Sequence, residues 1–387
     1  METLDFHVIV MLYLISCSLR KEKPDEMKFE GIDLNELYDI SKKQSLNAAV
    51  YYSLSKTEFF KKSDVLIREK WQESYNKAIR KNILLDIERN EILNEFEKNQ
   101  IWYMPLKGVI IKDLYPNTGI RQMADNDILF DGKYRTTVKK LMINRKYDVI
   151  SYGEGVHDVY EKSTIYNYEM HIAPFDERYN KNWYEYYKDI KNRLVLKSGK
   201  KYMYNFTDED FYIYIIAHAF KHFDNKGIGY RFLMDIFVFI TNKNLNWNYI
   251  SKELKYLKID NFEEHTRLLS FKIFKEINFD FYKNLSTEEI KMLNGFSKAG
   301  TYGNSLILME NNLKKLQDNN SSNIKRKTKI RYCVRRVFPG ILWCKNNYPF
   351  FGKHPYFIPF LWIYRGFKML INRKRILNEI SNLYKSK

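Results

Sequence analysis

Hydrophobic side chains recur at helical spacing over most of the first hundred residues. Residues 4–19 are strongly apolar, and residues 33–54 fit a pair of further helices. Residues 64–99 repeat apolar side chains every three or four positions, which predicts one long amphipathic helix. The apolar positions of that helix are Leu66, Trp71, Tyr75, Ile79, Ile83, Leu84, Ile87, Ile92 and Phe96. The pattern therefore predicts an N-terminal helical region over residues 1–98.

The apolar stretch at residues 4–19 has two features that argue against export or membrane insertion. Its start carries Glu2 and Asp5, whereas a secretion signal begins with positive charge. The stretch is also shorter than the roughly 18–20 residues that cross a bilayer. The three cysteines of the chain are scattered, as is usual in a reducing compartment. We therefore expect a cytoplasmic protein, with peripheral attachment to the membrane as the alternative.

Beyond residue 100 the hydrophobic pattern shortens into runs that are typical of β-strands. The predicted strands are residues 101–104, 125–130, 147–151, 157–161 and 165–172. A helical pattern at residues 133–144 separates them, which predicts a small mixed sheet with helices on one face. Helical periodicity returns at residues 208–223 and 246–293.

We expect an α+β fold in which this small mixed sheet is embedded in N- and C-terminal helical regions. The predicted regions are a helical region at residues 1–98, the sheet core at 99–200, a helical region closing a cleft at 201–317, and a basic, aromatic-rich C-terminal segment at 318–387. The polar residues 318–323 mark the linker to that last segment.

Two aspartates open the most informative of the predicted strands. Asp125 and Asp127 precede an apolar run, and residues two apart on a strand project from the same face. Two carboxylates held so close repel each other unless a cation lies between them. Oxygen ligands suit Mg²⁺, which proteins commonly hold with one or two carboxylates and the phosphates of a substrate. The pair therefore predicts a divalent metal site at one end of a buried strand.

A second strand-like run supplies a third carboxylate. Glu169 and His171 are also two residues apart, so they share a face of their strand. If this strand neighbours the first one, Glu169 completes a triad of carboxylate ligands. The pattern leaves two roles open for His171, which either orients Glu169 or contacts the substrate. It is not expected to bind the metal itself, because Mg²⁺ prefers oxygen ligands.

Lys107 and Gly108 stand between a predicted strand and a predicted helix. Free amide N–H groups at such a junction bind phosphate, and Lys107 would add a positive charge. A plain turn with a solvated lysine is the alternative, and the acid pair that follows favours the phosphate site. Arg121 lies four residues before Asp125, and it either binds phosphate oxygens or pairs with an aspartate.

Two further pairs of polar residues lie on the helices that follow. His218 and His222 are four residues apart, a spacing that places them on one helix face and can bind zinc. The metalloprotease motif requires a glutamate after the first histidine, and Ala219 stands there instead. Arg231 and Asp235 are also four residues apart, which favours a structural ion pair. We expect these four residues to support the site or to contact substrate.

Together these residues resemble the uncharacterised nucleotidyltransferase family of the DNA polymerase beta-like superfamily. The resemblance is carried by LKG at 106–108, LYP at 114–116, Arg121, the DNDILF run at 125–130 and YEMH at 168–171. Two helical segments, AHAFKH at 217–222 and RFLMDI at 231–236, also agree. The resemblance implies an enzyme that transfers a nucleoside monophosphate from a nucleoside triphosphate, such as ATP, to a hydroxyl or phosphate. The acceptor stays open among small molecules, glycans, peptides or proteins, and RNA.

The resemblance also implies roles for the candidate residues. The implied catalytic residues, which would also bind Mg²⁺ or alternatively Mn²⁺, are Asp125, Asp127 and Glu169. The implied nucleotide-binding residues are Lys107, Gly108 and Arg121.

The net charge of +18 is concentrated near the C-terminal end of the sequence. Residues 321–387 hold sixteen lysines and arginines and a single acid, Glu379. Aromatic residues interleave with basic ones over residues 324–375, which fits an anionic membrane surface, a nucleic acid or a helical tail packed on the protein. Two alternative functions follow. One is a non-catalytic protein that binds nucleic acid or membrane through this segment, and the other is a toxin-like nucleotidyltransferase of a toxin–antitoxin pair.

Overall fold

The computed structural model describes residues 3–316, 326–341, 344, 348, 350–351 and 354–371. It divides into two compact units, which are described separately. The first comprises Met1–Phe220 with Gly229–Ser297, and the second comprises Lys221–Ile228 with Lys298–Lys387. The predicted linker at residues 318–323 lies outside the described residues, and the four-region division of the sequence stays a prediction.

The N-terminal helices form as the hydrophobic pattern predicts. The apolar stretch is the helix α1 (Phe6–Arg20), which begins at the N-cap Asp5 and buries every residue from Val8 to Ser18. The long amphipathic helix is α5 (Val65–Lys98), and Asp64 caps it by accepting a hydrogen bond from the Leu66 amide at 2.8 Å. Between them lie α2 (Leu34–Lys43), α3 (Asn47–Leu54) and the short α4 (Glu58–Lys61).

The predicted buried face of α5 is only partly correct. Leu66, Ile83 and Ile87 are exposed, at 73%, 48% and 57% of their surface. The buried stripe consists of Ile67, Trp71, Ala78, Asn82, Leu85, Arg89, Ile92, Leu93 and Phe96. The true stripe keeps helical spacing but passes through the polar Asn82 and Arg89, so a search for apolar residues alone selects the neighbouring face.

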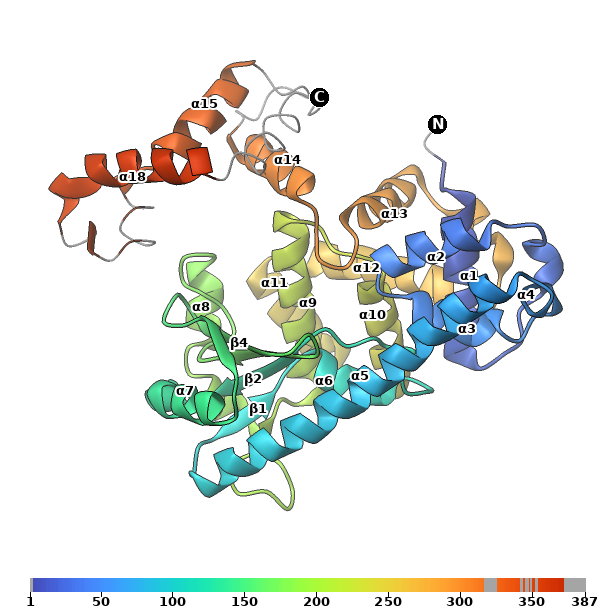
Figure 1. Cartoon of the computed structure of the whole chain (residues 1–387), viewed down its shortest axis with the longest axis horizontal. Helices are drawn as coiled ribbons and strands as arrows, with labels where there is room; N and C mark the ends of the chain where they lie inside the picture. Colours follow the sequence, from blue (N-terminus) through green and yellow to red (C-terminus); the bar gives the residue numbers. More distant parts are fainter. Residues whose placement is uncertain are drawn as a thin grey trace. The chain divides into compact units, whose positions relative to one another are not determined.

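The first unit contains a five-stranded mixed sheet (Figure 1). Its strands are β1 (Tyr103–Pro105), β2 (Asn126–Phe130), β3 (Asp148–Ser151), β4 (His157–Lys162) and β5 (Tyr166–His171). Their order in the sheet is β1-β2-β5-β4-β3. The β2–β5 pair is parallel, whereas the other neighbours are antiparallel. A separate two-stranded sheet pairs β6 (Val195–Leu196) with β7 (Tyr204–Asn205). This is the expected α+β fold with a small mixed sheet and flanking helices.

Two helices cover one face of the five-stranded sheet. Ile128, Phe130, Tyr168 and Met170 point from β2 and β5 into a core that also contains residues of α5 and α7 (Arg135–Asn144). These strand residues alternate with Asp127, Glu169 and His171, which therefore project from the opposite face. The apolar face packs the sheet against the helices and leaves the polar face for the site.

Of the remaining helices of the first unit, α6 lies between β1 and β2 and the others follow β5 along the chain. They are α6 (Gly108–Ile111), α8 (Lys181–Tyr187), α9 (Asp208–Asn225), α10 (Arg231–Asn242), α11 (Trp247–Leu257), α12 (Asp260–Phe274) and α13 (Thr287–Ala299). The second unit adds α14 (Ser305–Leu316), α15 (Arg326–Val337) and α18 (Ile358–Ile371). Short 3₁₀ turns are η1 (Glu26–Lys28), η2 (Lys112–Leu114), η3 (Gly132–Tyr134), η4 (Ile190–Arg193), η5 (Phe279–Asn284) and η6 (Pro355–Phe357). Within the described parts of the chain, no helix combines the length and the apolar character needed to cross a membrane.

Candidate active site

The parallel pairing of β2 with β5 brings two of the predicted carboxylates together. Asp127 and Glu169 are direct partners across the two strands, and His171 stands opposite Leu129, two residues further on. Because alternate residues share a face, all three polar side chains project from the same side of the sheet. The strand begins at Asn126, so Asp125 lies just before it rather than within it.

Lys107 and His171 both contact the two carboxylates. Lys107 Nζ lies 2.6 Å from Asp127 Oδ1 and 3.8 Å from Glu169 Oε2. His171 Nε2 lies 2.9 Å from the same Asp127 oxygen and 3.4 Å from the same Glu169 oxygen. The ligand atoms of Asp127, Glu169 and His171 all lie within 4.8 Å of one another. Both oxygens thus converge on a shared positive charge on the polar face of the sheet.

The charges of this cluster stabilise one another. Burial opposes ionisation of Asp127, but the charge of Lys107 and the contact with His171 outweigh burial and lower its pKa. Burial likewise opposes the charged form of Lys107, and Asp127 more than compensates, so the pKa of Lys107 is raised. The pKa of Glu169 is lowered in spite of its burial, first through the hydrogen bond with His171. The cluster therefore holds ionised carboxylates in a largely buried place.

Asp125 is the least stabilised of the three predicted carboxylates. Burial, followed by the negative charge of Asp127, raises the pKa of Asp125 to about 6, and Lys107 only partly offsets them. It does not belong to the group of ligand atoms that lie within 4.8 Å of one another among the described residues. A carboxylate that is repelled in this way gains stability when a divalent cation binds nearby.

The backbone at Lys107 adopts a strained conformation. Its φ of 53° and ψ of −123° lie in a region that L-residues other than glycine rarely occupy, which costs about 1–3 kcal/mol. The neighbouring Leu106 N–H donates to the Asp127 carbonyl at 2.9 Å, which ties this turn to the start of β2. In this backbone conformation the Lys107 ammonium contacts the Asp127 carboxylate.

The Arg121 guanidinium packs closely against the backbone of Gly108. A Cβ on Gly108 would lie only 2.4 Å from Arg121 Nη1, so only glycine leaves room for the guanidinium. Arg121 binds both oxygens of Asp235, at 2.8 and 2.9 Å, and Tyr115 donates to the same carboxylate at 2.7 Å. Arg121 thus pairs with an aspartate, one of the two outcomes that the pattern left open, and the aspartate is on α10. The helix α6 after Gly108 is a single turn, so its dipole is small.

The other predicted positions lie around this ion pair or further along α9. Arg231 donates to the Gln122 carbonyl at 3.2 Å, while the carboxylate of Asp235 is engaged by Arg121. The ring of His218 lies 6.1 Å from the ring of Tyr214 within α9. His222 is in the last turns of α9, in the part that groups with the second unit.

Two polar residues on α5 hydrogen-bond to residues next to the two aspartates. The sequence motifs did not predict these contacts. Arg89 donates to the Asn126 side chain at 3.0 Å, between the two aspartates in sequence, and also pairs with Asp86 at 2.8 Å. Asn82 donates to the Arg121 carbonyl at 3.1 Å. Both are buried, at 8% and 3% exposure. A polar residue on the buried stripe of a helix is the signal that could have identified them.

Tyr214 is a further residue that motif analysis missed. Its ring is fully buried and stacks on Phe206 with 5.5 Å between the ring centroids. Its hydroxyl has no hydrogen-bond partner among the described residues. Burial raises the pKa of Tyr214, and the charges of Lys107, Asp127 and Glu169 act on it as well. A buried, unpaired hydroxyl beside a charged cluster is available for a ligand.

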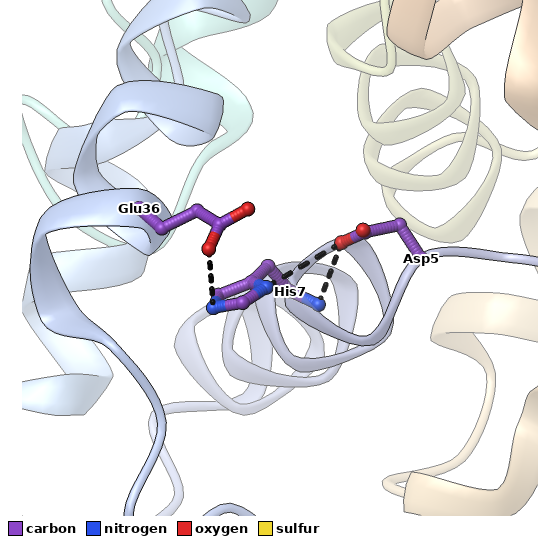
Figure 2. A group of neighbouring side chains, drawn as sticks. All are labelled: Asp5, His7 and Glu36. Carbon is purple, nitrogen blue, oxygen red and sulfur yellow. Dashed lines mark hydrogen bonds and ion pairs between the residues drawn. The ribbon is translucent and has the colours of Figure 1, made fainter.

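A second cluster of metal-ligand residues lies at the start of α1 (Figure 2). Asp5 lies 3.6 Å from His7 Nδ1, whereas Glu36 lies 3.5 Å from Nε2. The carboxylates thus face opposite nitrogens of one ring, and Asp5 Oδ1 also caps α1 by accepting from the His7 amide at 2.8 Å. The His7 ring thus links the start of α1 to Glu36 on α2.

The donor set on the polar face of β2 and β5 suits a hard divalent cation. It offers two ionised carboxylates on adjacent strands, with Asp125 close by in sequence and a histidine that contacts both oxygens. In a comparison with known protein families, the family model described as uncharacterised nucleotidyltransferase matches residues 30–275. Neither a curated protein sequence nor a solved structure matches the chain.

Proposed function

The chain belongs to the uncharacterised nucleotidyltransferase family, and from that premise we propose that it transfers a nucleoside monophosphate from a nucleoside triphosphate to a hydroxyl or phosphate of an acceptor in a Mg²⁺-dependent reaction. Membership of the family makes it a nucleotidyltransferase, and the metal, the acceptor and the site residues are our proposal. The observation that carries it is the convergence of Asp127 and Glu169, from adjacent parallel strands, on one positive charge.

In the proposed reaction an acceptor oxygen bonds to the α-phosphorus, and the bond from that phosphorus to the pyrophosphate oxygen breaks. Asp127 and Glu169, joined by Asp125, would hold one or two Mg²⁺ ions. Bound there, Mg²⁺ would lower the pKa of the acceptor hydroxyl and neutralise the leaving pyrophosphate. Most of the catalytic work of the protein is then positioning and charge stabilisation.

The remaining side chains have distinct proposed tasks. His171 presents Nε2 to two carboxylates, which only accept, so this nitrogen carries the hydrogen and orients Glu169. Glu169 is half-buried and ionised, which suits it to receive the proton of the acceptor hydroxyl. Lys107 and the amide of Gly108 would bind the triphosphate, and a cation held by Asp127 would leave the Lys107 ammonium free to pair with the phosphates.

Two residues have proposed roles that follow from their contacts. Arg121 is held by Asp235 and fits against Gly108, so we propose that it positions the phosphate-binding turn from below. Tyr214 offers its unpaired hydroxyl to the substrate phosphates or to a water molecule in the site. Substitution of a residue with only a structural role would lower stability. Substitution of either of these two residues should instead lower turnover while the protein still folds.

Transfer from labelled nucleoside triphosphates tests the proposed function. The purified full chain is incubated with each α-labelled NTP, Mg²⁺ and a cell extract that supplies acceptors, and transferred label and released pyrophosphate are measured. We expect Asp127→Asn to abolish transfer while leaving the circular dichroism spectrum unchanged. Asp131→Asn is the matched control, because Asp131 follows the other end of β2 and caps η3. Full activity in the Asp127→Asn variant would refute the site assignment.

A further inference from the structure

The second unit exposes large apolar side chains along one stripe of α15. Ile330, Val334 and Phe338 are 55%, 51% and 51% exposed. They are four residues apart, and Phe338 directly follows the last residue of α15. At that spacing they lie on the same side of the helix. An aligned row of exposed branched and aromatic side chains has an energetic cost in water.

The η6–α18 segment exposes a second apolar row. Ile358 and Leu361 are buried and pack with Cys344, so one side of α18 is covered within the second unit. The exposed side chains are Tyr356, Phe357, Phe360, Ile363 and Tyr364, at 90%, 47%, 63%, 59% and 55%. The apolar surface of this segment therefore continues beyond what its own packing requires.

The two rows belong to neighbouring helices. The ring of Phe338, at the end of α15, lies 5.4 Å from the ring of Trp362 in α18, and Arg365 donates to the Arg336 carbonyl at 3.1 Å. We define the amphipathic surface as the eight exposed apolar residues of α15, η6 and α18 just described together with the basic residues beside them.

Basic side chains form a second stripe of α15 next to the apolar one. Lys327, Arg331 and Arg335 are exposed and are also four residues apart. Over residues 321–387 the sequence holds sixteen basic residues and one acidic residue. The partner of this surface must therefore supply negative charge and, at the same place, an apolar phase.

We propose that the amphipathic surface binds the headgroup region of an anionic lipid bilayer. The bilayer interface presents negative charge beside hydrocarbon, so it accommodates both stripes of α15 at once. A nucleic acid would satisfy the basic residues and stack on the aromatic rings, but it offers nothing to the aliphatic Ile330, Val334 and Ile363. A second copy of this chain would bring the same positive charge against itself. The inference does not depend on the proposed catalytic reaction.

Vesicle binding by the full chain tests this proposal. Sedimentation with phosphatidylcholine vesicles is compared with sedimentation with vesicles that contain phosphatidylglycerol, at low and high salt. We expect at least about tenfold tighter binding to the anionic vesicles, and a partial loss at high salt because exposed charges are then screened. The residual binding at high salt reports the apolar contribution.

Two pairs of matched variants separate the apolar and the basic contributions. Phe360→Ser with Ile363→Ser should lower vesicle binding at every salt concentration, whereas Leu268→Ser with Tyr256→Ser, at exposed apolar positions of the first unit, should not. Arg331→Glu with Arg335→Glu should remove the preference for anionic lipid, whereas Lys252→Glu with Lys255→Glu on α11 should keep it. All substituted side chains are exposed, so folding should be preserved, as circular dichroism will show.

Three results would overturn the proposal. The first is equal binding to neutral and anionic vesicles. The second is tight binding to single-stranded RNA with no binding to vesicles. The third is a concentration-dependent dimer, seen by sedimentation velocity, that the Phe360→Ser and Ile363→Ser changes dissociate.

Discussion

Asp125 and Asp127 show how the surroundings of a residue decide its chemistry. The two aspartates are two positions apart, yet the pKa of one is raised to about 6 and that of the other is lowered. Burial opposes the ionisation of both aspartates. The difference is that Asp127 contacts Lys107 and His171, whereas Asp125 experiences the charge of Asp127 with less compensation. A cation beside Asp125 would relieve this repulsion.

The pKa of Asp125 predicts how stability depends on pH. The folded pKa of about 6 exceeds the value of 3.8 for an unperturbed aspartate, so the folded chain binds more protons between these pH values. Stability of the metal-free protein should therefore fall as pH rises through this window. Asp125→Asn should be more stable than the parent by about 1–3 kcal/mol at pH 7 in EDTA, and equally stable near pH 4. Urea unfolding at both pH values measures this, and equal stability at pH 7 would contradict the prediction.

Tyr214 predicts opposite changes in stability and activity. Tyr214→Phe removes a buried hydroxyl that lacks a partner among the described residues, so the protein should be as stable or more stable. Transfer activity should nevertheless fall by roughly 5- to 100-fold, which corresponds to the loss of one hydrogen bond worth about 1–3 kcal/mol. Thermal unfolding and steady-state kinetics, with kcat and KM determined separately, give the two readings.

Tyr160→Phe is the control for that prediction. The Tyr160 hydroxyl on β4 is also buried without a partner in the described structure, and its ring lies in the core on the other face of the sheet. This variant should keep its activity. If Tyr214→Phe also keeps full activity, Tyr214 has only a packing role.

At the scale of single elements, the turn before α6 depends on a close approach between backbone and side chain. Gly108 leaves room for the Arg121 guanidinium, and that guanidinium is fixed by Asp235 on α10. The strained Lys107 precedes it directly. The position of the Lys107–Gly108 turn therefore depends on β2, through the bond from the Leu106 N–H to the Asp127 carbonyl, and on Asp235 of α10, which fixes Arg121.

Gly108→Ala should disturb this turn. A methyl group 2.4 Å from Arg121 Nη1 must push the guanidinium off Asp235, which should destabilise the protein by about 1–3 kcal/mol and reduce transfer activity. The matched control is Gly295→Ala in α13, where an added Cβ meets nothing within 4 Å. That change should stabilise the helix by roughly 0.5–1 kcal/mol. Urea unfolding distinguishes them, and similar behaviour of the two variants would show that Arg121 adjusts freely.

At the scale of the whole molecule, ligand binding should be visible as a gain in stability. If Mg²⁺ and a nucleoside triphosphate bind only the folded chain, a concentration one hundred times the Kd adds about 2.7 kcal/mol. Calorimetric unfolding with NTP in the presence of Mg²⁺ or EDTA measures this gain. The gain should require Mg²⁺ and should be lost in Asp127→Asn. An equal gain in EDTA would contradict metal-dependent binding at this site.

Much of the fold follows from local patterns. The helices α1 and α5, and the strands β4 and β5, lie close to their predicted bounds, because their apolar spacing and caps are properties of short stretches of sequence. The buried face of α5 was less predictable. Arg89 and Asn82 are polar, and only their partners Asn126 and Arg121, from the region of β2, make them suitable for burial.

The local sequence pattern was enough to predict the family, the order of most helices and strands, and the residue types of the candidate site. It placed Glu169 with His171 on one strand face and Asp127 at the start of another, since the period of a strand is two residues. Tertiary packing was needed to make β2 and β5 parallel neighbours in a register that pairs Asp127 with Glu169. Tertiary packing also directs Arg121 to Asp235 and buries Tyr214 where the charges of Lys107, Asp127 and Glu169 act on it. These outcomes depend on side-chain contacts between residues far apart in the chain, which no local periodicity encodes.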